Sequence, residues 1–152
     1  MKKKNNEEVG KVVVEIEAAA LLRLADNLPT DFSRTIEAVL KTKGRVIVSG
    51  VGKSGHVGRK IAATLASTGT PSSFVHATEA SHGDLGMITT DDFCLVISNS
   101  GETSELNDIL THAKRFGIPT AVISSSKNSS LMQAADFKLA VPNAPEACAI
   151  RM

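Results

Sequence analysis

Residues 45–58, RVIVSGVGKSGHVG, pass from a continuous apolar run into a turn rich in glycine. Such a run, followed at once by a helical stretch, is typical of a buried strand in a parallel sheet. The glycines at positions 50, 52 and 55 match the G-x-G-x-x-G fingerprint of dinucleotide-binding turns. Gly52, Lys53 and Ser54 also match the end of a P-loop, but the leading glycine of that motif would have to stand at Ile47. The spacing therefore excludes a P-loop.

Short apolar runs of the same kind recur along the chain, with helical stretches between most of them. The runs are residues 45–49, 73–76, 93–98, 120–124 and 137–141, and the helices include 57–68 and 104–116. This alternation predicts an α/β fold, a doubly wound five-stranded parallel sheet of the flavodoxin-like type with helices on both faces. No repeat or linker interrupts the pattern, which predicts a single domain over residues 1–152.

Two further helices are expected before the first strand. The first covers about residues 7–27 and carries apolar side chains on more than one face. The second is capped by Thr30 or Asp31 and ends near Lys43. Burial of the several apolar faces of the first helix requires a partner surface, so we expect a homo-oligomer, either a dimer or a tetramer.

The composition argues against nucleic acid and membranes as partners. The chain has 17 basic and 16 acidic residues, a net charge of +1, and five Phe without Tyr or Trp. It therefore offers neither a basic field nor aromatic rings for stacking bases. Cys94 and Cys148 are too few for a disulfide framework. Glu15 and Glu17 interrupt what would otherwise resemble a signal peptide, and no apolar run is long enough to span a bilayer, so we expect a cytoplasmic protein.

Ligands of open parallel sheets bind beyond the carboxyl ends of the strands. Three predicted strands end in loops rich in glycine and hydroxyl residues: GVGKSG at 50–55, SNSGET at 98–103 and SSSKNSS at 124–130. Hydroxyls and free amides at helix starts form a phosphate site without a metal or a large basic patch, although the same residues also make ordinary turns and caps. We therefore predict a phosphate site at these loops.

A dinucleotide is a weaker explanation of the phosphate site. The fingerprint needs an acidic residue about twenty positions further on, at the tip of the second strand, to hold a ribose. Glu79 is the candidate, but it lies beyond the turn that follows the strand. A nicotinamide-dependent enzyme therefore remains an alternative, and a lone G-x-G-x-x-G is weak support for it.

The motifs together resemble those of the sugar isomerase (SIS) domain family, whose members bind phosphosugars. Within that family, residues 50–88, SNSGETSEL at 98–106 and PEAC at 145–148 resemble the bacterial D-arabinose-5-phosphate isomerases. The resemblance implies interconversion of D-arabinose 5-phosphate and D-ribulose 5-phosphate, in the synthesis of 3-deoxy-D-manno-octulosonate for lipopolysaccharide. It implies a pentose phosphate as partner and no cofactor or metal.

The resemblance also assigns roles to individual residues. It implies that the sugar phosphate is held at the two hydroxyl-rich loops by Ser54, Ser98, Asn99, Ser100 and Thr103. It implies that the polar groups of the active site include Lys53, Glu102, Glu146 and His82. Members of the family continue into a further segment with a His-Pro-Gly-Gly stretch, and usually into CBS domains. The chain is therefore expected to be C-terminally truncated, without CBS domains, and to bind the sugar phosphate but isomerise it poorly.

An aldose–ketose exchange needs a base beside the carbonyl and a cation facing the developing oxyanion. Glu102, Glu146 and His82 are the candidate bases, and Lys53 is the candidate cation. Each has a simpler explanation: a carboxylate such as Glu102 is favoured at any helix start, and His82 can merely line the pocket. His76 lies close to His82 in the sequence, but two histidines without a third ligand make a poor metal site. A noncatalytic phosphosugar-binding module remains the alternative to an isomerase.

Overall fold

The computed structural model describes residues 5–147. The chain divides into two units, one containing its two ends, up to Leu28 and from Val141, and the other formed by Pro29–Ala140. The prediction of a single domain over residues 1–152 stays a prediction. In the part of the chain that is described, no helix is both long and apolar enough to cross a membrane.

The first unit contains the helix α1 (Asn6–Asp26). Asn5 caps it: the Asn5 side chain accepts a hydrogen bond from Glu7 N at 3.4 Å, and the Glu8 carboxylate accepts one from Asn5 N at 3.3 Å. No residue of α1 is buried. The long first helix that the sequence predicts is therefore present, and its apolar residues are exposed or, at Val13, Ile16, Ala20 and Leu24, half-buried.

The second unit contains the sheet and the remaining helices. In chain order its elements are α2 (Phe32–Lys41), β1 (Val46–Gly50), α3 (Gly52–Ser67), β2 (Ser72–Phe74), α4 (Ala77–Ser81), the 3-10 helix η1 (Asp84–Met87), β3 (Phe93–Ile97), the 3-10 helix η2 (Ser104–Leu106), α5 (Asn107–Phe116), β4 (Thr120–Ser124), α6 (Ser130–Ala134) and β5 (Phe137–Ala140). All five strands run parallel, in the order β2-β1-β3-β4-β5. The predicted fold class is confirmed.

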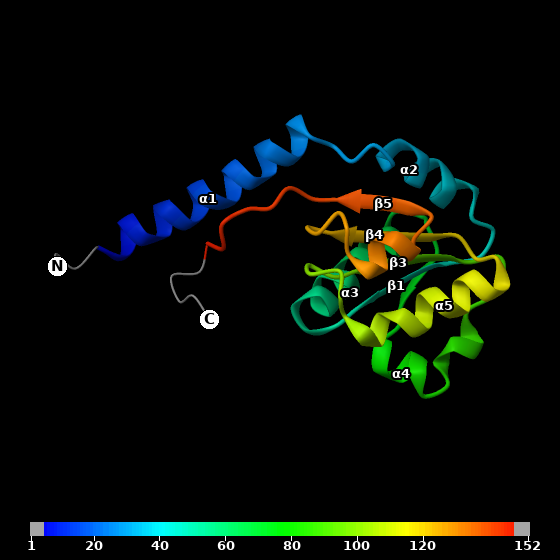
Figure 1. Cartoon of the computed structure of the whole chain (residues 1–152). Helices are drawn as coiled ribbons and strands as arrows, with labels where there is room; N and C mark the ends of the chain where they lie inside the picture. The colour runs from blue at the N-terminus through cyan, green and yellow to red at the C-terminus, as the bar shows by residue number, and fades with distance from the viewer. Residues whose placement is uncertain (1–4, 148–152) are drawn as a thin grey trace. The chain divides into compact units, whose positions relative to one another are not determined.

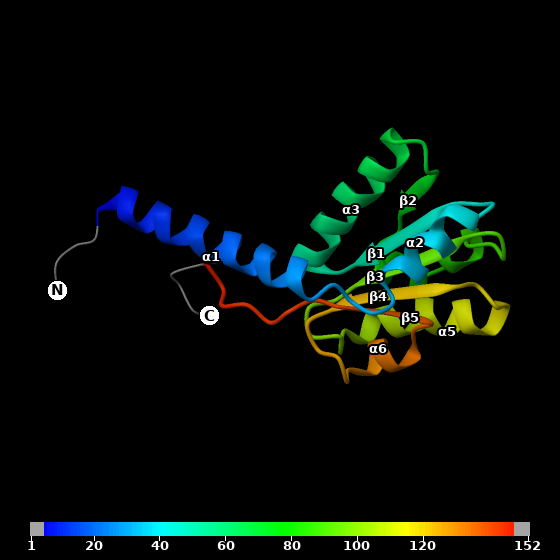
Figure 2. The same cartoon turned by 90° about the horizontal axis from the view of Figure 1, so that it is seen from above.

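Helices cover both faces of this sheet (Figures 1 and 2). On one face α2 and α3 pack against Val46, Val48 and Phe93, and on the other α4, α5 and α6 pack against Ile47, Cys94 and Val96. Neighbouring residues of one strand thus point into different cores, as strand geometry requires. Because both faces are buried, the strands are continuous apolar runs rather than alternating ones.

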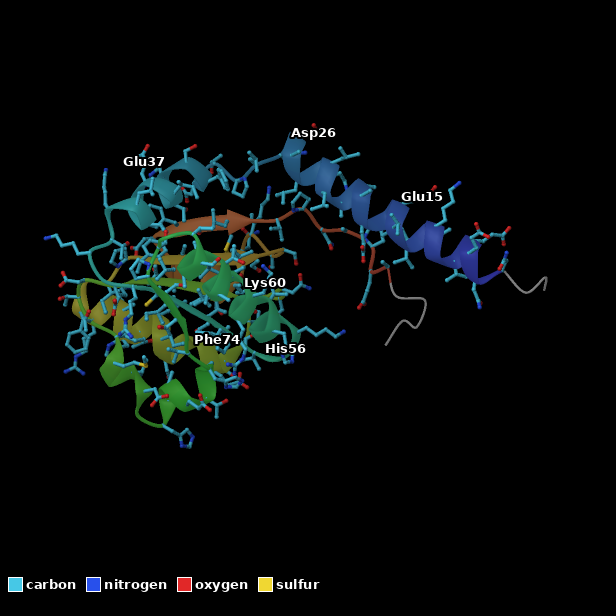
Figure 3. The ribbon with its side chains drawn as sticks, turned by 180° about the vertical axis from the view of Figure 1, so that it is seen from behind. Glu15, Asp26, Glu37, His56, Lys60 and Phe74 are labelled. Carbon is cyan, nitrogen blue, oxygen red and sulfur yellow. The ribbon has the colours of Figure 1, made fainter. Side chains whose placement is uncertain are left out.

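The start of α3 differs from the prediction. The sequence predicts a helix over residues 57–68 after a glycine turn, but α3 begins at Gly52, so most of that turn is helical. Glycine serves here for close packing: a Cβ at Gly55 would lie 2.8 Å from the Gly50 carbonyl oxygen, and one at Gly58 would lie 3.0 Å from the Phe74 ring. Figure 3 shows Phe74 beside the helix that carries His56 and Lys60.

The second helix also differs in detail. α2 ends at Lys41, two residues before the predicted end. Asp31 stands at the N-cap, but its carboxylate makes no capping bond. It accepts hydrogen bonds from Arg34 Nη1 at 2.8 Å and from Lys138 N, on β5, at 2.9 Å. Asp31 therefore ties the start of α2 to the edge strand of the sheet.

Candidate functional site

The sheet changes its winding direction between β1 and β3. The chain leaves β1 through α3 toward β2 on one side, and leaves β3 through α5 toward β4 on the other. Gly50 at the end of β1 lies in register with Ile97 at the end of β3. The loops that follow these two residues therefore leave the same edge of the sheet in opposite directions. Such a switch point is where ligands bind in doubly wound folds.

The loop after β3, residues 98–103, is the hydroxyl-rich turn SNSGET. Ser98 is buried, with 2% of its surface exposed, and its hydroxyl lies 2.8 Å from the Thr103 hydroxyl. The Ser98 hydroxyl also accepts a hydrogen bond from Gly101 N at 3.0 Å. Ser100 is exposed, and its hydroxyl accepts a bond from Glu102 N at 3.2 Å. The structure thus brings four predicted site residues, Ser98, Ser100, Glu102 and Thr103, into one turn.

The loop after β4 packs against this turn. The Asn99 carbonyl oxygen accepts hydrogen bonds from Ser125 N at 3.1 Å, from the Ser124 hydroxyl at 3.0 Å and from the Ser125 hydroxyl at 2.8 Å. Gly101 adopts a φ of +70°, and a Cβ there would lie 1.9 Å from the Ser129 hydroxyl oxygen. The two loops are therefore in direct contact, and only glycine fits at position 101.

Glu102 makes the most specific of these contacts. Its carboxylate accepts a hydrogen bond from Ser130 N at 2.9 Å and another from the Ser130 hydroxyl at 2.6 Å. The hydroxyl bond and then the backbone bond hold the pKa of Glu102 below its ordinary value. Glu102 is therefore an anion at neutral pH, engaged with the start of α6.

Ser54 and Lys53 lie in the first turn of α3, after β1. Lys53 is exposed and Ser54 is half-buried. A Cβ at Gly50 would lie 3.0 Å from the Ser54 backbone, so Ser54 is held close against the end of β1. Both predicted residues therefore occupy the β1 side of the switch point.

His82 lies at the end of α4, the short helix that follows β2. Its side chain is exposed. At the other end of α4, His76 caps the helix by accepting a hydrogen bond from Thr78 N on Nδ1 at 3.3 Å. α4 packs against α5 and η2, which follow the SNSGET loop. His76 therefore starts the helix at the carboxyl end of β2, and His82 lies beyond the far end of that helix.

Glu105 is a further candidate site residue, which the sequence analysis did not select. It lies in η2, and its carboxylate accepts a hydrogen bond from the Ser104 hydroxyl at 2.9 Å. Its pKa lies below the ordinary value, mainly because of its own backbone hydrogen bond and that of Ser104, with a smaller contribution from His76. The available signal was its place at a helix start beyond a strand end, the same signal that selected Glu102.

Ser49 is a second residue that the sequence reasoning passed over. It is the penultimate residue of β1 and is fully buried. Its hydroxyl oxygen has no hydrogen-bond partner among residues 5–147. A buried hydroxyl without a partner is costly, and this one lies next to the switch point.

Glu146 is placed differently from the other predicted site residues. Glu146 is exposed and lies in residues 141–147, which belong to the other unit of the chain. Its part in the site stays a prediction. Cys148 lies outside the described residues. Within residues 5–147, no group of three or more His, Cys, Asp and Glu side chains could hold a metal ion.

A groove lies at the amino-terminal ends of the strands. Its volume is about 510 Å³, and its lining includes residues 117–120 and 133–137, where β4 and β5 begin. Ligands of this fold bind at the carboxyl ends of the strands. The hydroxyl-rich loops after β1 and β3 lie at those carboxyl ends, so we place the candidate site there and not in the groove.

Known proteins resemble this chain in sequence and in fold. The family model of the SIS domain matches residues 39–152. Arabinose 5-phosphate isomerases KdsD of Escherichia coli K12 and Pseudomonas aeruginosa are 48% and 49% identical over 142 and 139 residues, or 93% and 91% of this chain. The chain covers 43% of each of these two relatives, so it spans less than half of their length.

A solved structure is matched over more of its own length. A protein of E. coli CFT073, determined in complex with arabinose 5-phosphate, superposes with a TM-score of 0.89 at 41% identity. The match covers 96% of this chain and 79% of the E. coli chain. The family that the sequence motifs indicate is thereby confirmed, and the chain belongs to the SIS domain family.

Proposed function

We propose that this chain is the sugar-phosphate isomerase domain of an arabinose-5-phosphate isomerase. The observation that carries the proposal is the turn Ser98–Thr103 at the switch point, in a chain 48% identical to the KdsD enzyme of E. coli K12. D-arabinose 5-phosphate and D-ribulose 5-phosphate are the two sugars exchanged. No cofactor is needed for this reaction.

The phosphate of the sugar binds at the loops after β1 and β3. Ser100 is exposed there, and the half-buried Ser54 supplies a second hydroxyl from the first turn of α3. Ser98 and Thr103 bond to each other, so they shape the turn as well as line it. Asn99 completes the set, with an exposed side chain. The N-terminus of α3 adds a partial positive charge that favours the phosphate dianion.

The isomerisation moves one proton between neighbouring carbons. A base removes the proton from C2 of the open-chain aldose, the electron pair of that C–H bond forms the C1–C2 double bond, and the π pair of the C1 carbonyl moves to O1, which gives the enediolate. A proton then returns to C1, and the O2 hydroxyl proton passes to O1 as C2 becomes the carbonyl carbon. Lys53 faces the developing oxyanion. His82, Glu146 and Glu105 are the candidate proton carriers, while Glu102, the fourth candidate, is engaged with Ser130.

Three finer statements belong to the same proposal. Arabinose 5-phosphate, made by the reverse of the reaction written above, feeds lipopolysaccharide synthesis, the protein works in the cytoplasm, and the chain forms a homo-oligomer. The support for association is the set of exposed apolar side chains on α1, among them Val14, Leu21 and Leu22, which are 65%, 68% and 67% exposed.

The direct test is exchange of arabinose 5-phosphate with ribulose 5-phosphate by the purified protein, followed in deuterated water. Incorporation of one solvent deuteron per turnover, lost in a Lys53→Met variant that still binds the sugar, is the expected result. Binding without any exchange favours the alternative, a noncatalytic phosphosugar-binding module.

A further inference from the structure

Glu102 and Ser130 join two loops that are 28 residues apart in the sequence. The Ser130 hydroxyl and amide both donate to the Glu102 carboxylate, at 2.6 and 2.9 Å. Such charge-assisted bonds are roughly twice as strong as neutral ones. The carboxylate side chain is therefore held in one place although it is exposed.

The backbone around Glu102 is fixed to the same loop. Leu131 N donates to the Gly101 carbonyl oxygen at 3.1 Å, and on the other side of Ser100 the Asn99 carbonyl accepts three bonds from Ser124 and Ser125. Ser100 thus lies between two residues, Asn99 and Gly101, whose backbone carbonyls are hydrogen-bonded to the neighbouring segment. Its hydroxyl remains at the surface, where a phosphate can reach it.

We propose that Glu102 is a positioning residue: together with Ser130 it clamps the SNSGET loop to the start of α6, and so presents Ser100 to the sugar phosphate. This inference rests on the proposed function for the identity of the ligand. It assigns to Glu102 a role different from that of a base. Both carboxylate oxygens of Glu102 are occupied by the donors of Ser130, which suits a clamp and leaves no free oxygen to take a proton from the sugar. These bonds also lower the pKa of Glu102.

The two roles give different kinetics. Loss of a clamp loosens the phosphate loop, so Glu102→Gln and Ser130→Ala should each raise KM by about 2- to 10-fold, the cost of one ordinary hydrogen bond. Both variants should leave kcat within about threefold and the pH profile unchanged. Loss of a general base would instead lower kcat by about 10²- to 10⁴-fold and remove one limb of the pH profile.

The pair should also behave as a unit. The double variant E102Q/S130A should bind the sugar phosphate no more weakly than the weaker single variant, because the interaction is already broken by either change. Ser130→Thr keeps the hydroxyl and should restore KM. The matched control is Ser67→Ala at the far end of α3, which removes a hydroxyl that donates to Thr64 O at 2.8 Å and should change nothing at the site.

Hydrogen exchange tests the clamp without any ligand. In Glu102→Gln the amides of residue 130 and Leu131, which donate to Glu102 and Gly101, should exchange faster than in the parent, while those of β3 are unchanged. Unchanged exchange there, or a collapse of kcat in Glu102→Gln with Ser130→Ala silent, overturns the proposal. A protein with an intact clamp by exchange that neither binds nor converts arabinose 5-phosphate refutes the proposed function instead.

Discussion

Ser98 and Ser100 lie two residues apart in the same turn, but only one of their hydroxyls is buried. The Ser98 hydroxyl is buried and holds Gly101 N and the Thr103 hydroxyl. The Ser100 hydroxyl is at the surface and accepts a bond from Glu102 N. Ser98 therefore stabilises the conformation of the loop, and Ser100 is the serine whose hydroxyl a phosphate can reach.

Ser98→Ala should lower the free energy of unfolding by about 1–3 kcal/mol, because it leaves the buried Gly101 N–H without an acceptor. Chemical denaturation measures this loss. Ser100→Ala is the matched control: it should change stability by less than half as much but weaken phosphosugar binding in calorimetry. Equal losses of stability in the two variants would contradict the division of roles.

Cys94 lies on β3, inside the core. Burial, and secondarily the charge of Asp92, raises the pKa of its thiol from 9.0 to about 12. The thiol should therefore stay protonated and react with a disulfide reagent only after unfolding, as measured in a Cys148→Ser background. Because the pKa is raised in the folded state, the stability that Cys94 contributes is complete below about pH 9 and is lost as the pH rises from there. Rapid labelling of the native protein would contradict this burial.

Close packing of α3 against β1 depends on a missing side chain. A Cβ at Gly55 would lie 2.8 Å from the Gly50 carbonyl oxygen, which is backbone and cannot turn aside. Gly55→Ala should destabilise the protein by about 1–3 kcal/mol, less the gain of about 1 kcal/mol in helix propensity. It should also weaken phosphosugar binding, because Ser54 lies beside the displaced backbone.

Gly10→Ala, in α1, is the control for Gly55→Ala. Apart from the helix's own neighbouring backbone, no atom of residues 5–147 lies within 4 Å of a Cβ at Gly10, so alanine there brings mainly its better helix propensity. Melting followed by circular dichroism separates the two variants by direction. A stabilising Gly55→Ala would mean that α3 can move away from β1.

A helix or strand can be predicted from the sequence when its hydrophobic pattern is long enough to recognise. The five strands lie within two residues of the predicted runs, because a strand buried on both faces is a continuous apolar run. The sequence does not predict α4 and α6, since five residues contain too few turns to show a helical period. It misplaces the start of α3 because the glycines there are typical of a turn, although they pack the helix against β1.

The sequence predicts only those parts of the site whose residues lie close together along the chain. Ser98, Ser100 and Thr103 lie within six residues after a strand, and their types alone indicate a phosphate loop. The Glu102–Ser130 contact spans 28 positions and depends on where β4 delivers its loop, which no local pattern encodes. The same limit explains why the sequence indicates a catalytic role for Glu102 and gives no sign of its bonds to Ser130.

At the scale of the whole molecule, the exposed apolar side chains of α1 predict that copies of the chain associate. α1 has 21 residues and none of them is buried, while Leu21 and Leu22 are more than 60% exposed. An isolated helix of this length is marginal in water, and exposed apolar side chains of this kind mark an interface. A closed symmetric assembly buries them against the same surface of a second copy.

The chain of 16.0 kDa should therefore sediment as a dimer or tetramer at micromolar concentration. Leu21→Gln with Leu22→Gln should shift it toward the monomer, since each leucine forfeits about 1.5–3 kcal/mol of burial. Glu15→Gln with Glu17→Gln on the same helix alters polar, exposed positions and should leave the assembly intact. A parent protein that sediments as a monomer, or a leucine variant that assembles as the parent does, would show that α1 has another partner.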